Sequence, residues 1–391
     1  MEQSVIFYAR RSPIGKLSGC LSSVPAPQLG AQLVKDLLRK TSLSPDKVDE
    51  IIMGNVLPAG VGQAPARQTA IYGGLPKSVC AMTINKVCGS GLKAVMLADQ
   101  ALKLGDASII LAGGQESMSL APHLLPNSRS GYRFGGFEAK DHMQWDGLWD
   151  PYGNMAMGQC GDICAKEYQF SREAQDAFAA ESYMRARNAW EKGLFSEEIV
   201  PIEVHDRKGT ITVMKDEEPF SVDLAKLSTL RPAFGKDGTI TAANASSIND
   251  GAALVGVATA SAAKASGLAP IAKIVASASF AQDPTWFTTA PVGAIKKVLA
   301  KAGLSIGQID CFEINEAFAV VPMVAMKDLG IPHEKVNVLG GAVSLGHPIG
   351  ASGARLIATL ISALKHTGGK RGLVTLCIGG GEASAMILEL V

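Results

Sequence analysis

The chain alternates between two kinds of hydrophobic pattern. Runs that are apolar almost throughout, such as residues 109–112 and 373–378, are typical of strands buried on both faces of a sheet. Other stretches carry apolar residues at helical spacing, and they predict helices over residues 89–104 and 353–365. The pattern therefore predicts an α/β fold in which mixed sheets are covered by helices.

The first and last thirds of the chain resemble one another. Residues 43–51 are similar to residues 304–312, and the Ser90-Gly91 pair that opens one predicted helix recurs as Ser352-Gly353 in the other copy. A repeat this long indicates duplicated domains, because the units of a solenoid span only ~20–50 residues. We therefore predict two similar α/β halves packed together.

A different kind of sequence separates the two halves. It is rich in Gly, Pro, Trp and charge, and it predicts one long helix over residues 172–192, with Ser171 as its N-cap and Gly193 as its stop. We interpret it as an inserted loop domain, where substrate contacts tend to gather. The predicted parts are an N-terminal half, the insertion and a C-terminal half, over residues 1–117 (completed by about 250–269), 118–249 and 270–391.

Composition and charge narrow the class of protein. The 391 residues carry 37 basic and 36 acidic side chains, a balance that calls for neither nucleic acid nor an anionic membrane as a partner. The apolar runs fall short of the ~18–20 residues that span a bilayer, and the N-terminus lacks the features of a signal peptide. Seven scattered cysteines fit reduced thiols better than a disulfide framework. We therefore expect a soluble cytoplasmic protein.

Cys88 is the first candidate for chemistry, in the segment Asn85-Lys86-Val87-Cys88-Gly89-Ser90-Gly91. It precedes a predicted helix, whose unpaired N–H groups and positive dipole end favour the reactive thiolate. The glycines leave room for a substrate carbonyl to approach the backbone. The alternative is a small buried core residue, which free cysteine often is.

His347 is the second candidate. It stands between Gly346 and Pro348, in a loop before the helix that matches the one after Cys88. The pseudo-symmetry of the halves places it across their interface from Cys88, where its ring could take the thiol proton and later polarise a carbonyl. A lone histidine is more often structural, so the pairing carries the argument.

Two further segments lie at the ends of predicted strands. Cys377, in Cys377-Ile378-Gly379-Gly380-Gly381, could act as an acid/base on a C–H proton while the glycine amides meet an oxyanion. Asn315, in Asn315-Glu316-Ala317-Phe318, could hold a water or a carbonyl. Taken alone, Cys377 is typical of a core thiol before a turn, and Asn315 is typical of an Asx turn or a helix cap.

Together, and in this order, these segments resemble the landmarks of the thiolase family over essentially the whole chain. The segments that carry the resemblance are Val87-Cys88-Gly89-Ser90-Gly91, Gly113-Gly114-Gln115-Glu116-Ser117-Met118-Ser119, Asn244-Ala245-Ser246-Ser247-Ile248-Asn249-Asp250-Gly251-Ala252-Ala253, Asn315-Glu316-Ala317-Phe318, Gly346-His347-Pro348 and Cys377-Ile378-Gly379-Gly380-Gly381. The resemblance implies the thiolase fold and an acyltransferase with a cysteine nucleophile. It implies acyl-coenzyme A substrates, with no tightly bound cofactor and no metal.

The resemblance also implies a role for each catalytic candidate. Cys88 is the nucleophile that carries the acyl group, His347 activates it, and Cys377 is the acid/base at the substrate α-carbon. One oxyanion hole is implied at the His347 ring and a water held by Asn315, and the other at the backbone N–H groups of Cys88 and Gly379. One such donor is typically worth about 3–4 kcal/mol, and the kinetics should be ping-pong.

Coenzyme A is expected to lie along the insertion. Ser246 resembles the pantetheine-contacting serine of the family, and Leu148 and Met157 resemble positions that line the same channel. Ala317 and Phe318 are also expected contacts of coenzyme A.

The sequence departs from the family pattern at two places in this channel. Ala156 stands where short-chain members often have a histidine, and residues 216–221 lack the arginine that some relatives direct at the ADP phosphates. Lys208, Lys226 and Arg231 are the candidates to replace that arginine.

The leading functional hypothesis is an acetyl-CoA C-acetyltransferase, which joins two acetyl-CoA into acetoacetyl-CoA and CoA or runs in reverse. Residues 377–381 resemble short-chain members, and Trp286-Phe287 could close the acyl pocket against longer chains. One alternative is a broader-chain 3-ketoacyl-CoA thiolase of fatty acid β-oxidation. Another is a non-catalytic acyl-CoA- or lipid-binding relative, which we would expect to have lost Cys88, His347 or Cys377.

Three other interpretations have weaker support. A ketoacyl synthase acting on carrier protein lacks the second cysteine that Cys377 supplies. A Rossmann oxidoreductase needs a Gly-x-Gly-x-x-Gly after the first strand, and residues 11–16 do not supply it. A zinc site at Cys160 and Cys164 lacks a companion pair of ligands nearby. Because thiolase relatives are dimers or tetramers, we expect a homotetramer joined through residues 122–141.

Overall fold

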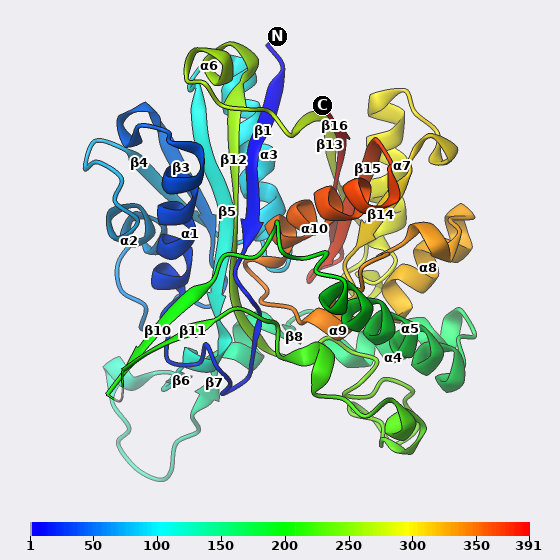
Figure 1. Cartoon of the computed structure of the whole chain (residues 1–391). Helices are drawn as coiled ribbons and strands as arrows, with labels where there is room; N and C mark the ends of the chain where they lie inside the picture. Colours follow the sequence, from blue (N-terminus) through cyan, green and yellow to red (C-terminus); the bar gives the residue numbers. More distant parts are fainter. Residues whose placement is uncertain (1, 208) are drawn as a thin grey trace.

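The computed structural model describes residues 2–207 and 209–391, and Figure 1 shows the whole chain. Ten of the described strands form one mixed sheet, in the order β14-β15-β16-β13-β1-β12-β5-β3-β4 with β2 beside β12. The strands of the N-terminal half are β1 (Ser4–Arg11), β2 (Gly15–Lys16), β3 (Glu50–Gly54), β4 (Cys80–Ile84), β5 (Ile109–Ser117) and β12 (Asn249–Thr259). Those of the C-terminal half are β13 (Ala272–Ala281), β14 (Cys311–Ile314), β15 (Arg371–Ile378) and β16 (Glu382–Leu390).

The α/β fold predicted from the hydrophobic pattern is confirmed, and the sheets of the two halves are joined. β1 and β13 meet through a short antiparallel contact, in which Val5 pairs with Lys273 and Ile6 with Ala272. On either side of this contact the halves repeat one arrangement. Strands farther from the contact pair in parallel (β3 with β5, β14 with β15), and strands nearer to it pair antiparallel (β5 with β12, β15 with β16).

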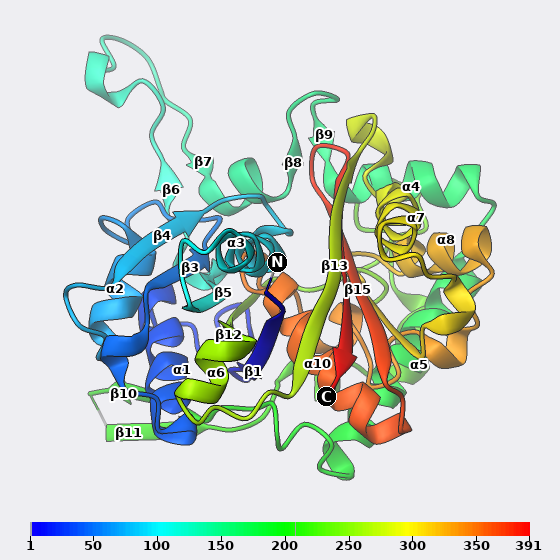
Figure 2. The same cartoon turned by 90° about the horizontal axis from the view of Figure 1, so that it is seen from above.

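Helices form layers on both sides of the sheets. The outer helices are α1 (Ala26–Thr41) and α2 (Pro65–Tyr72) on one half, and α7 (Ala290–Ala302) and α8 (Val320–Leu329) on the other. Between the halves lie α3 (Ser90–Leu104) and α10 (Ser352–Thr367), as seen from above in Figure 2. α10 is buried at every residue from Ser352 to Leu364, as expected for a helix that is covered all round. Two shorter helices are α6 (Ala260–Ala265) and α9 (Ala342–Leu345).

The repeated Ser-Gly pair marks the point where α3 and α10 touch. A Cβ at Gly91 would lie 2.8 Å from the backbone nitrogen of Ala354, and one at Gly353 would lie 2.2 Å from that of Leu92. Only glycine permits this approach of two backbones. Because the contact involves the first residues of both helices, the loops that precede them lie side by side, and these loops carry Cys88 and His347.

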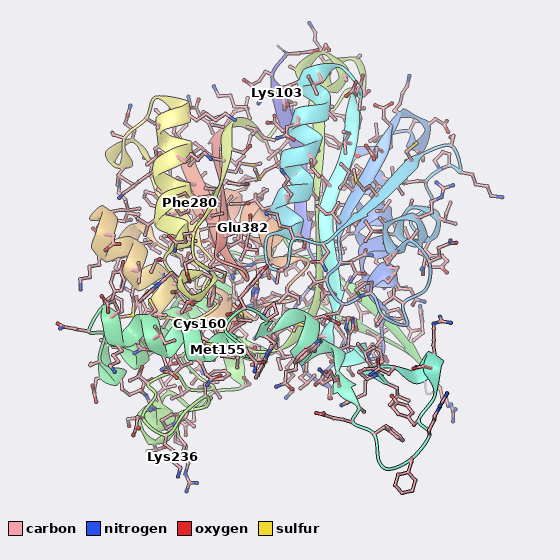
Figure 3. All side chains as sticks on the ribbon, turned by 180° about the vertical axis from the view of Figure 1, so that it is seen from behind. Lys103, Met155, Cys160, Lys236, Phe280 and Glu382 are labelled. Atoms are coloured by element: carbon pink, nitrogen blue, oxygen red, sulfur yellow. The ribbon has the colours of Figure 1, made fainter. Side chains whose placement is uncertain are left out.

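The insertion covers one end of the two halves. Its elements are β6 (His123–Leu124), β7 (Lys140–Asp141), β8 (Trp149–Asp150), β9 (Met155–Ala156), α4 (Met157–Glu167), α5 (Arg172–Glu191), β10 (Ile202–Asp206) and β11 (Gly209–Val213). The predicted long helix is α5, and Ser171 Oγ accepts the Ala174 N–H at 3.1 Å as the expected N-cap. α4 is a further helix that the hydrophobic pattern does not predict. Seen from behind, Met155 and Cys160 lie in this layer and Lys236 extends from its outer edge (Figure 3).

Candidate active site

The loop before α3 presents Cys88 from a constrained backbone. Val87 has a φ of +45°, a conformation that β-branched residues rarely adopt. Asn85 Oδ1 accepts the Val87 N–H at 2.9 Å. Ser90 Oγ accepts the Lys86 N–H at 2.8 Å and donates to the Val87 carbonyl at 2.7 Å. Side chains on both sides of the cysteine therefore hold the strained turn that aims it.

The loop before α10 fixes the protonation of the His347 ring. His347 Nδ1 lies 2.6 Å from Ser352 Oγ, and the Ser352 hydroxyl donates its own proton to the Pro348 carbonyl at 2.9 Å. Ser352 Oγ is therefore the acceptor for an Nδ1–H group, and Nε2 keeps its lone pair. Asn315 Nδ2 lies 3.5 Å from Nε2, on the same side as that lone pair. The basic nitrogen of His347 is thus Nε2.

Asn249 holds the backbone of the same loop. Its Oδ1 accepts the His347 N–H at 2.8 Å, and its Nδ2 donates to the Gly15 carbonyl at 3.0 Å. Gly346 adopts a φ of +103°, and a Cβ there would lie 2.6 Å from the Asn249 side chain. The glycine before the histidine is required both by its conformation and by this contact.

Cys377 and Asn315 lie directly behind the two loops. Cys377, at the end of β15, and Asn315, just after β14, are both fully buried. The charge of a Cys88 thiolate would raise the pKa of Cys377. The backbone N–H of Gly379 favours the thiolate of Cys88. The turn after Gly379 then uses Gly380 and Gly381, with φ of +88° and +83°.

Burial keeps the three titratable groups neutral. It raises the pKa of Cys88 to about 11, although the Gly379 N–H acts in the opposite direction. The N–H groups of Gly379 and Cys88 act toward the thiolate, and the desolvation of the Cys88 sulfur opposes them. Burial, together with the positive charge of Arg355, lowers the pKa of His347 to about 3. Burial and the neighbouring Cys88 raise the pKa of Cys377 well above its ordinary value.

Glu116 ties the N-terminal half to the histidine loop. Its carboxylate accepts the Asn55 side-chain amide at 2.7 Å, the Val56 N–H at 2.9 Å and the Gly350 N–H at 2.9 Å. A Cβ at Gly114 would lie 1.9 Å from the Gly350 carbonyl oxygen, so that position also requires glycine. These contacts account for the Gly-Gly-Gln-Glu segment that the sequence singles out.

A surface ion pair ties the cysteine loop to the last turn. Lys86, two residues before Cys88, pairs with Glu382, which follows the turn of Gly379 and is labelled in Figure 3. The cysteine loop, the histidine loop and the turn after β15 are therefore held together by contacts outside the reacting groups.

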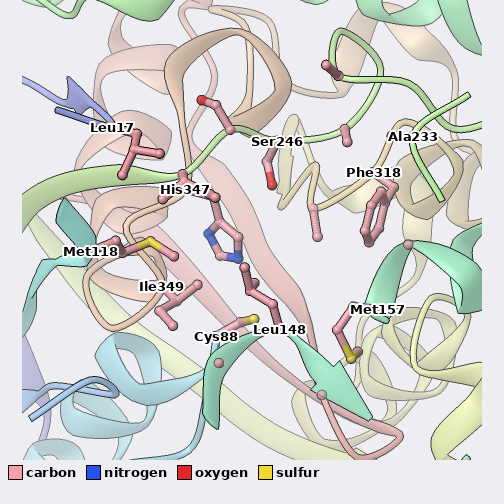
Figure 4. A pocket seen from close by; sticks show the side chains of 18 of the residues that line it. Leu17, Cys88, Met118, Leu148, Met157, Ala233, Ser246, Phe318, His347 and Ile349 are labelled. Atoms are coloured by element: carbon pink, nitrogen blue, oxygen red, sulfur yellow. The ribbon is translucent and has the colours of Figure 1, made fainter. Parts of the chain in front are cut away.

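A cavity of about 540 Å³ opens onto these groups (Figure 4). Among the expected catalytic residues, Cys88, His347 and Gly379 line it, and Figure 4 shows the first two facing the same space. Asn315 and Cys377 are not lining residues and lie buried behind the wall. All the residues expected to contact coenzyme A line the cavity, namely Leu148, Met157, Ser246, Ala317 and Phe318.

The structure also decides which of the other sequence candidates reach the cavity. Phe287 lines it and Trp286 does not. Neither Lys226 nor Arg231 is a lining residue. Lys208 lies outside the described residues.

The sequence analysis missed two charged lining residues. Lys16, an exposed basic side chain, and Glu218 both line the cavity. Lys16 ends β2 and Glu218 begins a short 3-10 helix in the insertion, and no sequence motif marks either position.

The search for a metal site and for a membrane span gives no candidate. In residues 2–207 and 209–391, no group of three or more His, Cys, Asp and Glu side chains could hold a metal ion. Cys160 and Cys164 lie on α4 and are buried in the apolar core. No helix in the described part of the chain combines the length and the apolarity needed to cross a bilayer.

Comparisons with known proteins agree with this arrangement. The family model "Thiolase, N-terminal domain" matches residues 4–261, and "Thiolase, C-terminal domain" matches residues 268–390. Acetyl-CoA acetyltransferase from Allochromatium vinosum is 52% identical over 390 residues, which are 99% of each chain. Acetyl-CoA acetyltransferase from Cupriavidus necator is 49% identical over 100% of each chain.

Two solved structures have the same fold over the whole chain. The acetyl-CoA acetyltransferase of Bacillus anthracis superimposes with a TM-score of 0.97 at 38% identity, covering 100% of this chain and 99% of that one. The Acat5 thiolase of Ascaris suum, in complex with coenzyme A, gives a TM-score of 0.95 at 42% identity over 100% of both chains. With both family models matched across its two halves, the chain belongs to the thiolase family.

Proposed function

We propose that the protein is an acetyl-CoA C-acetyltransferase, which condenses two acetyl-CoA into acetoacetyl-CoA and CoA and catalyses the reverse thiolysis. The observation that carries the proposal is the joint placement of Cys88, a neutral His347 and the Gly379 N–H at one apolar cavity. The acetyl-CoA acetyltransferases to which the chain is similar over its whole length support the same activity.

The first half-reaction transfers an acyl group to Cys88. His347 Nε2 takes the proton of the thiol, and the sulfur attacks the thioester carbonyl of the first acetyl-CoA. The N–H groups of Cys88 and Gly379 meet the developing oxyanion. When the tetrahedral intermediate collapses, the C–S bond to coenzyme A breaks and acetyl-Cys88 remains. The coenzyme A sulfur leaves with a proton, which Cys377 supplies.

The second half-reaction forms the carbon–carbon bond. The Cys377 thiolate takes a proton from the methyl group of the second acetyl-CoA. Burial raises the pKa of Cys377, and a thiolate of higher pKa is a stronger base. A strong base is needed because the C–H group is only weakly acidic. The enolate oxygen is met by His347 Nε2–H and by a water held by the Asn315 amide, which lies 3.5 Å from Nε2. The enolate carbon attacks the carbonyl of acetyl-Cys88, the C–S bond to Cys88 breaks, and the sulfur takes back its proton from His347 Nε2–H as acetoacetyl-CoA leaves.

Coenzyme A fits the cavity by its chemistry. Ser246, Leu148 and Met157 offer the mixture of one hydroxyl and apolar walls that suits a pantetheine arm. Lys16 is the basic side chain that lines the same space, and we place the phosphates of coenzyme A nearest to it.

The aromatic wall of the cavity favours substrates with short acyl chains. Phe318 packs edge-on against Phe234 and Phe287, with ring centroids 6.2 Å and 6.3 Å apart, and Phe287 is only 3% exposed. We expect wild type to cleave acetoacetyl-CoA about 10- to 200-fold faster, in kcat/KM, than 3-ketooctanoyl-CoA, the range that pocket size gives. Phe287→Ala should narrow that ratio, because it opens the wall.

Steady-state thiolysis of both substrates measures the ratio, and Trp286→Ala is the matched control because Trp286 does not line the cavity. Equal kcat/KM for the two substrates in wild type would favour the broader-chain thiolase of β-oxidation instead. No thiolysis of either would favour the non-catalytic acyl-CoA-binding relative.

We also propose that the protein assembles as a homotetramer. β4 is the last strand of the sheet and exposes Cys80 and Met82, and an exposed edge strand is a template for pairing with a second copy. The loop between β6 and β7 projects from the body (Figure 2), and its Phe134 and Phe137 are 101% and 60% exposed. Apolar side chains presented in this way mark an interface.

Sedimentation velocity tests the assembly. We expect a tetramer for wild type and a dimer for the double variant Phe134→Asp/Phe137→Asp, since only the projecting loop is changed. A wild-type monomer would contradict the proposal.

A further inference from the structure

A buried ion pair lies behind the candidate active site, among groups that the proposed reaction does not use. Arg355 of α10 is 1% exposed, and its Nη1 donates to Glu313 Oε2 at 3.3 Å. The adjacent Arg11 is already neutralised, because it donates to Glu198 at 2.6 Å and to both oxygens of Asp216 at 2.7 and 2.9 Å. Arg355 therefore has Glu313 as its nearest acidic partner, Glu198 and Glu316 also act on it, and burial raises the pKa of Glu313 to about 8.

The geometry of this pair is poor for a purely structural bridge. Arg355 Nε and Glu313 Oε1 are both buried, and among the described residues neither makes a hydrogen bond. Buried ion pairs of this kind add little stability, and apolar residues of similar size often replace them without loss. The presence of a charged pair at this place therefore needs an explanation other than stability.

That reason is the second contact of Arg355. Its Nη2 donates to Asn315 Oδ1 at 3.4 Å, which turns the other end of the amide, Nδ2, toward His347 Nε2 at 3.5 Å. Without a cation at Oδ1, the Asn315 amide could rotate and present its oxygen to the ring. The same helix holds the opposite side of the ring through Ser352, which accepts Nδ1–H. α10 thus controls both nitrogens of His347.

We propose that Arg355, held in place by Glu313, is a positioning residue that fixes the Asn315 amide with its Nδ2 toward the His347 ring. The inference rests on the proposed function, in which His347 must begin as a base and Asn315 must donate. Arg355 touches no substrate and acts through Asn315 and His347.

Charge near the ring has the required sign. Arg355 is the charged group that lowers the pKa of His347, in addition to burial, and the Cys88 thiol and Ser352 hydroxyl that face the ring are uncharged. The groups that act on Arg355 itself are Glu313, Arg11, Glu198 and Glu316.

The test compares Arg355→Met with Arg355→Lys. Loss of the positive charge raises the pKa of His347. When the pH is lowered, the ring of the variant therefore takes up its proton at a higher pH than the ring of wild type. In Arg355→Met we expect the acid limb of kcat/KM for acetoacetyl-CoA thiolysis to move up by about 1 pH unit. We expect kcat to fall about 10²-fold as the amide donor is lost, with KM unchanged. In Arg355→Lys the limb should stay near that of wild type, while kcat still falls.

Two further measurements keep the test decisive. The double variant Glu313→Gln/Arg355→Met removes the unpaired carboxylate, and we expect it to show the same shifted limb as the single variant. Alkylation of Cys88 by iodoacetamide reports the titration of the ring without turnover. If wild type shows no thiolysis, the proposed function fails, and the alkylation profile still tests Arg355. An acid limb that is unmoved in Arg355→Met, or moved equally in Arg355→Lys, would overturn the proposal.

Discussion

Replacing Cys88 by alanine is expected to abolish both condensation and thiolysis, with kcat falling by a factor on the order of 10⁶, as when the nucleophile of a catalytic unit is removed. The physical reason is that no other thiol lines the cavity, since Cys377 is buried behind its wall. Loss of the acetoacetyl-CoA enolate absorbance in the presence of CoA measures the effect. Cys80→Ala, at an exposed thiol on β4, is the matched control.

Substantial thiolysis by Cys88→Ala would show that the acyl group is carried elsewhere or transferred directly between coenzyme A molecules. Ordinary fold and stability of this variant are expected, because Cys88 is only partly buried and the strained turn is held by Asn85 and Ser90.

Replacing Cys377 by alanine is expected to separate the two half-reactions. Acetyl transfer from acetyl-CoA to Cys88 should remain within about tenfold of wild type, because a coenzyme A thiolate can leave without the proton that Cys377 supplies. Acetoacetyl-CoA formation should fall by about 10²–10⁴-fold, the contribution of a general acid/base, because deprotonation of the acetyl methyl group has no such alternative.

The separation is measured by exchange of labelled CoA into acetyl-CoA, which needs only acylation, against formation of acetoacetyl-CoA. Cys164→Ala, another buried thiol of the same core, is the control. Equal loss of both activities would contradict the division of roles, and so would full retention of carbon–carbon bond formation.

The fold could be predicted largely because the sequence repeats. Ser90-Gly91 and Ser352-Gly353 mark the contact of α3 and α10, and no larger residue fits at either glycine. Once that contact is made, the loops that carry Cys88 and His347 must lie together. The glycine pairs also have a steric origin, since Gly114 lies against the Gly350 carbonyl. Backbone contacts this close require glycine, and a sequence pattern can therefore reveal them.

What could not be predicted depends on long-range geometry and on burial. The pKa of Cys88 is raised by desolvation, which sequence position does not reveal and which opposes the effect of the backbone N–H groups around the sulfur. Val87 carries no sign of its φ of +45°. The contact of Arg355 with Asn315 joins residues 40 positions apart through one side-chain hydrogen bond. The join between β1 and β13 is likewise a pairing that neither strand's own pattern encodes.

The most direct test of the account is to mix the protein with acetyl-CoA alone, quench, digest, and weigh the peptide that contains Cys88. We expect an acetyl group on that peptide and free CoA released in equal amount. The acetyl group should be lost when CoA is added. An unmodified Cys88 peptide in protein that nevertheless makes acetoacetyl-CoA would contradict it, as would an acetyl group on any other residue that forms and is discharged at the rate of turnover.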